Sequence, residues 1–153
     1  MSKLVSPHGG SGLKALLAPR AERAEQFERA RGLTKVPMTS REISDVLMMA
    51  MGAYTPLDGF MGKNNWRRVC LDMKLRNGVF WPIPITLSCD KTLADSIHVE
   101  EEVALVDGES GEILAFMEVT EKYRPDKTLE CEQVYRTTDP AHPGVKKVLE
   151  QGE

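Results

Sequence analysis

The most constrained stretch of the chain is residues 52–62, which read Gly-Ala-Tyr-Thr-Pro-Leu-Asp-Gly-Phe-Met-Gly. Three glycines, one proline and two aromatic residues in eleven positions are typical of a loop with sharp turns that apolar side chains anchor to a core. Gly59 is expected in a backbone conformation that a Cβ atom would strain. The residues before the loop predict a helix, because Thr39 and Glu42 form a capping-box pattern and Gly52 follows as a C-cap. Apolar residues recur between these caps at helical spacing, at Ile43, Val46, Leu47, Ala50 and Met51.

A second helix is expected directly after the loop. Its N-cap is Asn64 or Asn65, and it runs to about Lys74 with apolar side chains on one face. The pair Asn77-Gly78 then marks a tight turn, after which the sequence patterns become extended.

The later part of the chain is rich in strand patterns. Residues 79–88 predict a strand in which Pro82 and Pro84 lie two positions apart, so that one side lacks amide donors and must be an edge or a bulge. Residues 103–106 and 113–120 predict a hairpin around the sequence Asp-Gly-Glu-Ser-Gly. Further helices are expected at residues 21–31 and 129–135, and residues 146–149 are expected to begin a final helix or turn. This order predicts an α+β fold with a small, partly closed antiparallel sheet.

Composition and charge fit one globular domain. The 153 residues are 41% hydrophobic and 28% charged, and their net charge is −3. A nucleic-acid-binding protein usually carries a basic excess or a basic stripe, and this sequence has neither. No apolar run approaches the roughly 20 residues that span a bilayer. The first ten residues lack the apolar centre of a signal peptide.

The cysteines favour a reduced environment. Cys70, Cys89 and Cys131 are odd in number and widely spaced, without a Cys-x-x-Cys pair. No two histidines lie at the spacing of metal ligands. We therefore expect three free thiols, no metal site and a cytoplasmic location.

The motifs that could carry chemistry each have a structural alternative. Residues 7–12, Pro-His-Gly-Gly-Ser-Gly, lack the spacing and flanking elements of a phosphate-binding loop, so a turn is expected. Successive carboxylates at residues 100–102 would point to opposite faces of an extended chain, which favours a solvated turn over an acid cluster. His98 lies in a strand-like stretch as a packed or surface side chain. His142 either contacts a substrate or a partner, or anchors its loop through a hydrogen bond.

Four segments, in this order, resemble the N-terminal domain of ATP sulfurylases (sulfate adenylyltransferases). They are residues 7–10, 45–61, 81–87 and 137–145. The residues that carry the resemblance are expected to shape loops: Gly52, Pro56, Leu57, Gly59, Phe60, Met61, Trp81, Pro82, Pro84, Asp139, His142, Pro143 and Gly144. One departure is Arg136, where the family pattern has glycine.

The resemblance implies that residues 1–153 form a PUA-like domain with a small, partly closed β-barrel and N-terminal and flanking helices. In the intact enzymes this domain precedes an α/β catalytic domain, which is expected to be missing here. Those enzymes make adenosine 5′-phosphosulfate and pyrophosphate from ATP and sulfate, or run the reverse reaction in sulfur oxidation. The family's substrate-binding motifs, Gln-x-Arg-Asn-Pro-x-His-x-x-His and Gly-Arg-Asp, belong to the catalytic domain and do not occur in this sequence.

The resemblance therefore implies no catalytic, metal-binding or cofactor-binding residue in this chain. ATP with Mg²⁺ is expected to be used by the parent enzyme, which could also carry a fused kinase. The expected partners are the catalytic domain and, for a homo-oligomer, further copies of the chain, with neither membrane nor nucleic acid among them. The alternative from a different class is a free-standing PUA-like module that binds RNA, which the acidic balance disfavours.

Overall fold

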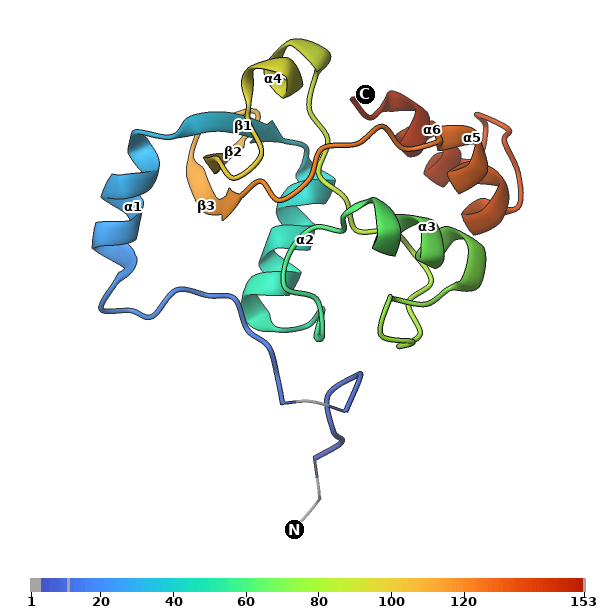
Figure 1. Ribbon diagram of the computed structural model, residues 1–153, viewed down its shortest axis with the longest axis horizontal. Helices are drawn as coiled ribbons and strands as arrows, with labels where there is room; N and C mark the ends of the chain where they lie inside the picture. The colour runs from blue at the N-terminus through green and yellow to red at the C-terminus, as the bar shows by residue number, and fades with distance from the viewer. Residues whose placement is uncertain (1–3, 11, 153) are drawn as a thin grey trace.

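A computed structural model describes residues 4–10 and 12–152 (Figure 1). Ser11 of the glycine-rich loop, residues 1–3 and Glu153 lie outside the described residues. The elements are α1 (Arg23–Arg31), β1 (Thr34–Met38), α2 (Ser40–Met51), α3 (Lys63–Asp72), α4 (Lys91–Ser96), β2 (Glu102–Asp107), β3 (Ile113–Glu118), α5 (Lys127–Glu130), the π-helix η1 (Cys131–Tyr135) and α6 (Pro143–Glu150). Helices and a small sheet share the chain, which confirms the expected α+β class.

The three strands form one mixed sheet in the order β1-β2-β3. β2 and β3 are the predicted antiparallel hairpin, with Val103 opposite Met117 and a register shift between Leu105 and Val106. β1 instead pairs parallel with β2, with Val36 opposite Leu105, so the expectation of an antiparallel sheet is wrong for this strand. The outer strands of the described sheet do not pair with each other, which is consistent with a partly open barrel.

Buried apolar side chains form three clusters. The first packs under the sheet and contains Val36, Met38, Ile97, Val103, Leu105 and Val119. The second lies between the 52–62 loop, α3 and the segment after it, and contains Leu57, Met61, Val69, Leu75, Trp81 and Ile85. The third joins η1 to α6 through Cys131, Val145 and Val148. In Figure 1, α1 stands at one end of the molecule and α5 and α6 at the other, with α2 and the sheet between them.

Helix α2 has the caps that its sequence predicts. The Thr39 hydroxyl accepts a hydrogen bond from the Glu42 amide, and the Glu42 carboxylate accepts one from the Thr39 amide at 2.8 Å. Gly52 ends the helix with φ at 79°, a left-handed conformation that favours glycine. A Cβ atom on Gly52 would lie 2.9 Å from Cγ of Leu13, so space as well as conformation requires glycine there.

The N-terminus of α3 differs from its prediction. The helix begins at Lys63, and Gly62 is its N-cap without a side-chain hydrogen bond. Asn65 does not cap the helix, because its side-chain oxygen accepts a hydrogen bond from the Arg76 amide at 2.8 Å. The asparagine therefore ties the start of the following turn back to α3.

Residues 79–88 do not form the predicted strand. Phe80 makes a single bridge with Lys74, and the Trp81 amide donates to the Met73 carbonyl at 2.8 Å. Since Pro82 and Pro84 have no amide proton, a continuous ladder cannot follow. The segment instead runs as an extended loop across the second cluster.

The segment between α4 and β2 tests two further predictions from the sequence. His98 follows α4 in a loop, so its placement in a strand-like stretch is wrong. Val99 and Glu100 form the expected turn before β2, which begins at Glu102. Glu100 has a φ of 71°, and Glu101 accepts hydrogen bonds from the His98 amide and the Thr34 hydroxyl. None of the helices in the described ranges has the length and apolar content that crossing a bilayer takes.

Candidate functional site

Three of the four resembling segments meet at Trp81. Its indole ring meets the Tyr54 ring edge-on at a centroid separation of 5.6 Å, and it lies 6.1 Å from the imidazole of His8. His8 Nε2 also donates to the Phe80 carbonyl at 2.7 Å. The N-terminal segment is therefore fixed to the segment around Trp81.

The 52–62 loop is held on the same site by backbone and side-chain contacts. The buried Thr55 hydroxyl accepts from the Lys14 amide at 2.9 Å and donates to the Gly52 carbonyl at 2.6 Å. The Met61 amide donates to the Ile85 carbonyl at 2.8 Å, and the peptide bond before Pro56 is cis. Residues 7–10, 52–62 and 81–87 thus form one packed unit, which we call the loop cluster.

Most residues of the loop cluster that carry the family resemblance are buried or half-buried. The buried ones are Gly52, Leu57, Met61, Trp81 and Pro84, and the half-buried ones are Pro56, Gly59 and Phe60. Pro82 is exposed. The strain expected at Gly59 is absent, because its φ is outside the left-handed region and a Cβ atom there would contact nothing within 4 Å.

The fourth segment, residues 137–145, packs separately against the third cluster. His142 is exposed and is the N-cap of α6, where its Nδ1 accepts from the Gly144 amide at 3.1 Å and the Val145 amide at 3.5 Å. This geometry corresponds to the loop-anchor alternative. Arg136, which precedes the segment, has φ and ψ of 59° and 22°, a conformation that glycine adopts more easily.

Glu42 connects α2 to the end of the loop cluster. Its side chain is 1% exposed, and its Oε1 accepts from the amide and the hydroxyl of Ser88 at 2.8 and 2.9 Å. Arg41 Nη2 lies 3.7 Å from the same oxygen and also donates to the Thr86 carbonyl at 3.3 Å. A buried carboxylate with this many donors is satisfied, and its role is to position two segments.

Asp45 continues this polar network along α2. Tyr54 donates to its Oδ1 at 3.0 Å, and Arg41 Nη1 lies 3.5 Å from its Oδ2. Burial raises the pKa of Asp45, while burial and the nearby carboxylate raise the pKa of Tyr54 to about 12. The Arg-x-x-x-Asp spacing on a helix is the one sequence signal that predicts this ion pair.

A second buried carboxylate lies beside the fourth segment. Glu130 is 5% exposed and accepts a hydrogen bond from Trp66 Nε1 at 2.6 Å, which joins α3 to α5. Burial raises the pKa of Glu130, and the Trp66 hydrogen bond lowers it less. Both partners are enclosed, so this pair also has the features of a structural contact.

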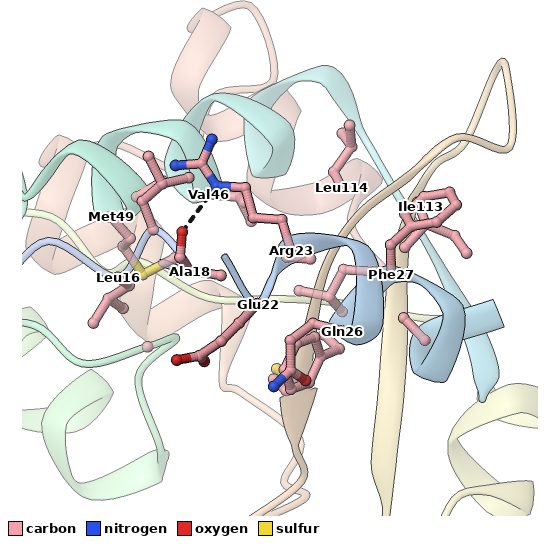
Figure 2. Close-up of a pocket in the computed structure, with 18 of the residues that line it drawn as sticks. Leu16, Ala18, Glu22, Arg23, Gln26, Phe27, Val46, Met49, Ile113 and Leu114 are labelled. Atoms are coloured by element: carbon pink, nitrogen blue, oxygen red, sulfur yellow. Dashed lines mark hydrogen bonds between the residues drawn. The ribbon is translucent and has the colours of Figure 1, made fainter. Parts of the chain in front are cut away.

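Two hollows open on either side of residues 58–60. One, of about 530 Å³, lies between α1, α2 and β3 (Figure 2). The other, of about 680 Å³, lies between the loop cluster, residues 86–89 and the segment that follows β3. Both have the size of small-molecule sites, and no local sequence pattern predicts them because their walls come from distant segments.

The part of the chain that the structure describes holds no group of three or more His, Cys, Asp or Glu side chains placed to bind a metal ion. Cys70 and Cys131 are buried and Cys89 is half-buried, and all three are free thiols. The contacts around Arg41, the Trp66–Glu130 hydrogen bond and the loop cluster each join separate elements of the chain.

An open mixed sheet with flanking helices and closely packed loops defines a small α+β domain. The chain matches the PUA-like domain family over residues 5–153 and belongs to that family. This confirms the fold that the sequence resemblance implied.

Relatives of the chain include longer proteins. It is 57% identical over 155 residues to a sulfate adenylyltransferase of Syntrophobacter fumaroxidans and 54% identical over 153 residues to one of Thiobacillus denitrificans. Both similarities cover 100% of this chain, which spans 38% and 37% of those proteins. A solved structure, the hexameric APS kinase from Thiobacillus denitrificans, has a TM-score of 0.70 and 32% identity, covering 80% of this chain and 24% of that one.

Proposed function

We propose that this chain is the N-terminal, non-catalytic domain of a sulfate adenylyltransferase and that it supports the enzyme's catalytic domain. The observation that carries this proposal is the similarity to sulfate adenylyltransferases along the whole chain, at 57% and 54% identity for the two relatives described above. Because the chain spans little more than a third of those proteins, a separate domain has room to carry the reaction. The same similarity favours this function over a free-standing RNA-binding module.

The chemistry supports a division of labour between domains. Transfer of an adenylyl group to sulfate brings several negative charges together, and catalysis requires cations and hydrogen-bond donors that converge on them. In this chain Arg41 is engaged by Glu42 and Asp45, and Lys122 donates to the carbonyls of Ala94 and Ile97. We therefore assign ATP and Mg²⁺ to the catalytic domain and no cofactor to this one.

Partners and location follow from the same proposal. The catalytic domain is the first partner, and the similarity to a chain of a hexameric protein supports homo-oligomerisation of the parent enzyme. Three free cysteines support a reducing, cytoplasmic location.

The test is pyrophosphate release from ATP in the presence of Mg²⁺ and sulfate. We expect no sulfate-dependent turnover by the 153-residue chain, turnover by a longer protein that carries both domains, and lower turnover by the catalytic domain alone. Sulfate-dependent turnover by the pure 153-residue chain contradicts a non-catalytic role. Equal turnover with and without this domain contradicts a supporting role.

A further inference from the structure

The hollow between α1, α2 and β3 has mainly apolar walls, with four polar or charged side chains among the lining residues. Figure 2 shows Val46 and Met49 of α2 facing Phe27 of α1 and Ile113 and Leu114 of β3 across it. Its volume of about 530 Å³ falls within the range of roughly 300–1,000 Å³ typical of small-molecule sites. Pockets of this kind bind ligands mainly through burial of apolar surface.

The wall formed by the segment before α1 is fixed by hydrogen bonds. The Leu16 amide donates to the Met49 carbonyl at 3.1 Å, and Arg23 Nε donates to the Ala18 carbonyl at 2.9 Å. One bond ties the segment to α2 and the other ties it to α1, as Figure 2 shows for Arg23 and Ala18. The hollow is therefore a pre-formed feature between three anchored elements.

Large apolar side chains remain uncovered around this hollow. The exposed fractions are 42% for Leu16, 58% for Leu17, 46% for Phe27 and 38% for Leu114. All four side chains line one concave surface, and exposed apolar surface gathered in this way marks binding sites.

The charges of the lining residues are balanced. Glu22 and Arg23 have opposite charges, and Asp58 is ion-paired with Lys14 at 3.2 Å. With its charges balanced, the hollow favours neither an anionic nor a cationic ligand. The Gln26 side-chain oxygen accepts from Arg29 at 3.1 Å, while neither N–H group of its amide nitrogen has an acceptor among the described residues, so the amide can donate to a ligand.

We propose that this hollow binds a small, uncharged and largely apolar molecule with one hydrogen-bond acceptor, such as an alcohol or a ketone. The apolar part lies against Phe27, Met49 and Leu114, and the acceptor meets the amide nitrogen of Gln26. A cavity of 150 Å³ holds benzene, so this half-open hollow has room for on the order of ten to fifteen non-hydrogen atoms. The site does not depend on the enzymatic role proposed above.

The test is a titration of the 153-residue chain with 1-octanol, followed by ¹H–¹⁵N NMR. We expect saturable shifts in α1 and β3, and affinities at least threefold weaker for octanoate and octylammonium, whose charges find no counterpart. Replacing Gln26 by leucine (Gln26→Leu) should weaken 1-octanol binding by about two- to tenfold, the worth of one hydrogen bond.

Matched variants locate the site. Leu114→Glu should weaken binding at least fivefold, whereas Leu149→Glu, at a similarly exposed leucine on α6, should leave it unchanged. Phe27→Ala serves the same purpose if Leu114→Glu fails to fold by circular dichroism. Shifts that do not saturate, or equal effects of Leu114→Glu and Leu149→Glu, would overturn the proposal. So would dimerisation of the ligand-free protein, seen by sedimentation and accompanied by shifts of the same residues, because a second copy would then cover the hollow.

Discussion

Arg136 has a backbone conformation that suits glycine better than arginine. Its φ and ψ are 59° and 22°, at the end of η1. A left-handed conformation costs a residue with a Cβ atom about 1–2 kcal/mol, and the greater chain entropy of glycine offsets about 0.5–1 kcal/mol of that. We therefore expect Arg136→Gly to increase the free energy of unfolding by about 0.5–1 kcal/mol, measured by urea denaturation.

Arg76→Gly is the matched control for this substitution. Arg76 is also an exposed arginine in a loop, but it is not among the residues with positive φ. Glycine should therefore cost about 0.5–1 kcal/mol there. Equal losses in the two variants would show that the conformation of Arg136 carries no strain, and the departure from the family pattern would then be neutral.

Glu130 should make stability depend on pH. Its raised pKa means that the native state keeps the proton to higher pH than the unfolded state, whose carboxyl titrates near 4.5. The stability contributed by the protonated carboxyl is therefore present at low pH and lost as the pH rises through the raised value. We expect Glu130→Gln, which keeps an acceptor for Trp66, to match the wild type near pH 4.5 and to exceed its stability at pH 8.

The control for this titration is Glu132→Gln, at an exposed carboxylate two residues away. Urea denaturation at several pH values should give parallel profiles for this variant and the wild type. A Glu130→Gln variant that is less stable than the wild type at pH 8 would show that the ionised carboxylate stabilises the fold through Trp66.

At the scale of elements, α6 depends on its histidine cap. His142 Nδ1 accepts from two amides of the first turn, so His142→Ala leaves these donors to water. We expect a loss of about 1 kcal/mol in thermal or urea unfolding, the usual cost of removing an N-cap. His142→Asn, which can cap a helix, should restore most of the loss. If both variants keep the wild-type stability, His142 is not an anchor, and contact with a partner becomes the better explanation.

Elements with local signals could be predicted from the sequence. The caps of α2 and the hairpin of β2 and β3 are specified by residues within a few positions of each other. β1 could not be predicted in this way, because Pro37 weakens its strand pattern and its partner β2 lies far along the chain. Residues 79–88 were wrongly predicted as a strand for a different reason. Trp81 and Ile85 are apolar because they belong to the second cluster, while the prolines of the segment prevent a ladder.

The candidate site was predicted only in part. The composition of residues 52–62 and 81–87 identified both loops as constrained, but their contact through Tyr54 and Trp81 is a tertiary feature. The buried carboxylates of Asp45 and Glu130 were not recognised, since an acidic residue is usually exposed and nothing nearby in the sequence marks its partner. The hollow beside α1 depends on three elements and has no local signal at all.

At the scale of the whole molecule, the three packed clusters are connected by buried polar contacts. The Trp66–Glu130 hydrogen bond ties α3, which supports the second cluster, to the helices of the third. Glu42 ties α2, which packs against the first cluster, to Ser88 beside the loop cluster. Contacts of this kind are costly to break singly, because each leaves a buried polar group without a partner. We therefore expect the clusters to unfold together.

The cysteines test this cooperativity, because they lie in different parts of the molecule. Cys70 lies on α3, Cys89 packs against the first cluster and Cys131 belongs to the third. Burial raises the pKa of all three thiols, and that of Cys70 to about 12, which suppresses the reactive thiolate.

With Ellman's reagent, we expect slow reaction of half-buried Cys89 in the native protein and protection of Cys70 and Cys131. In urea without reductant all three should react, and the protection of Cys70 and Cys131 should disappear at the midpoint seen by circular dichroism, as a two-state domain requires. Finding one reactive thiol in the unfolded protein would reveal a disulfide. Separate midpoints for Cys70 and Cys131 would show that α3 and the third cluster unfold independently.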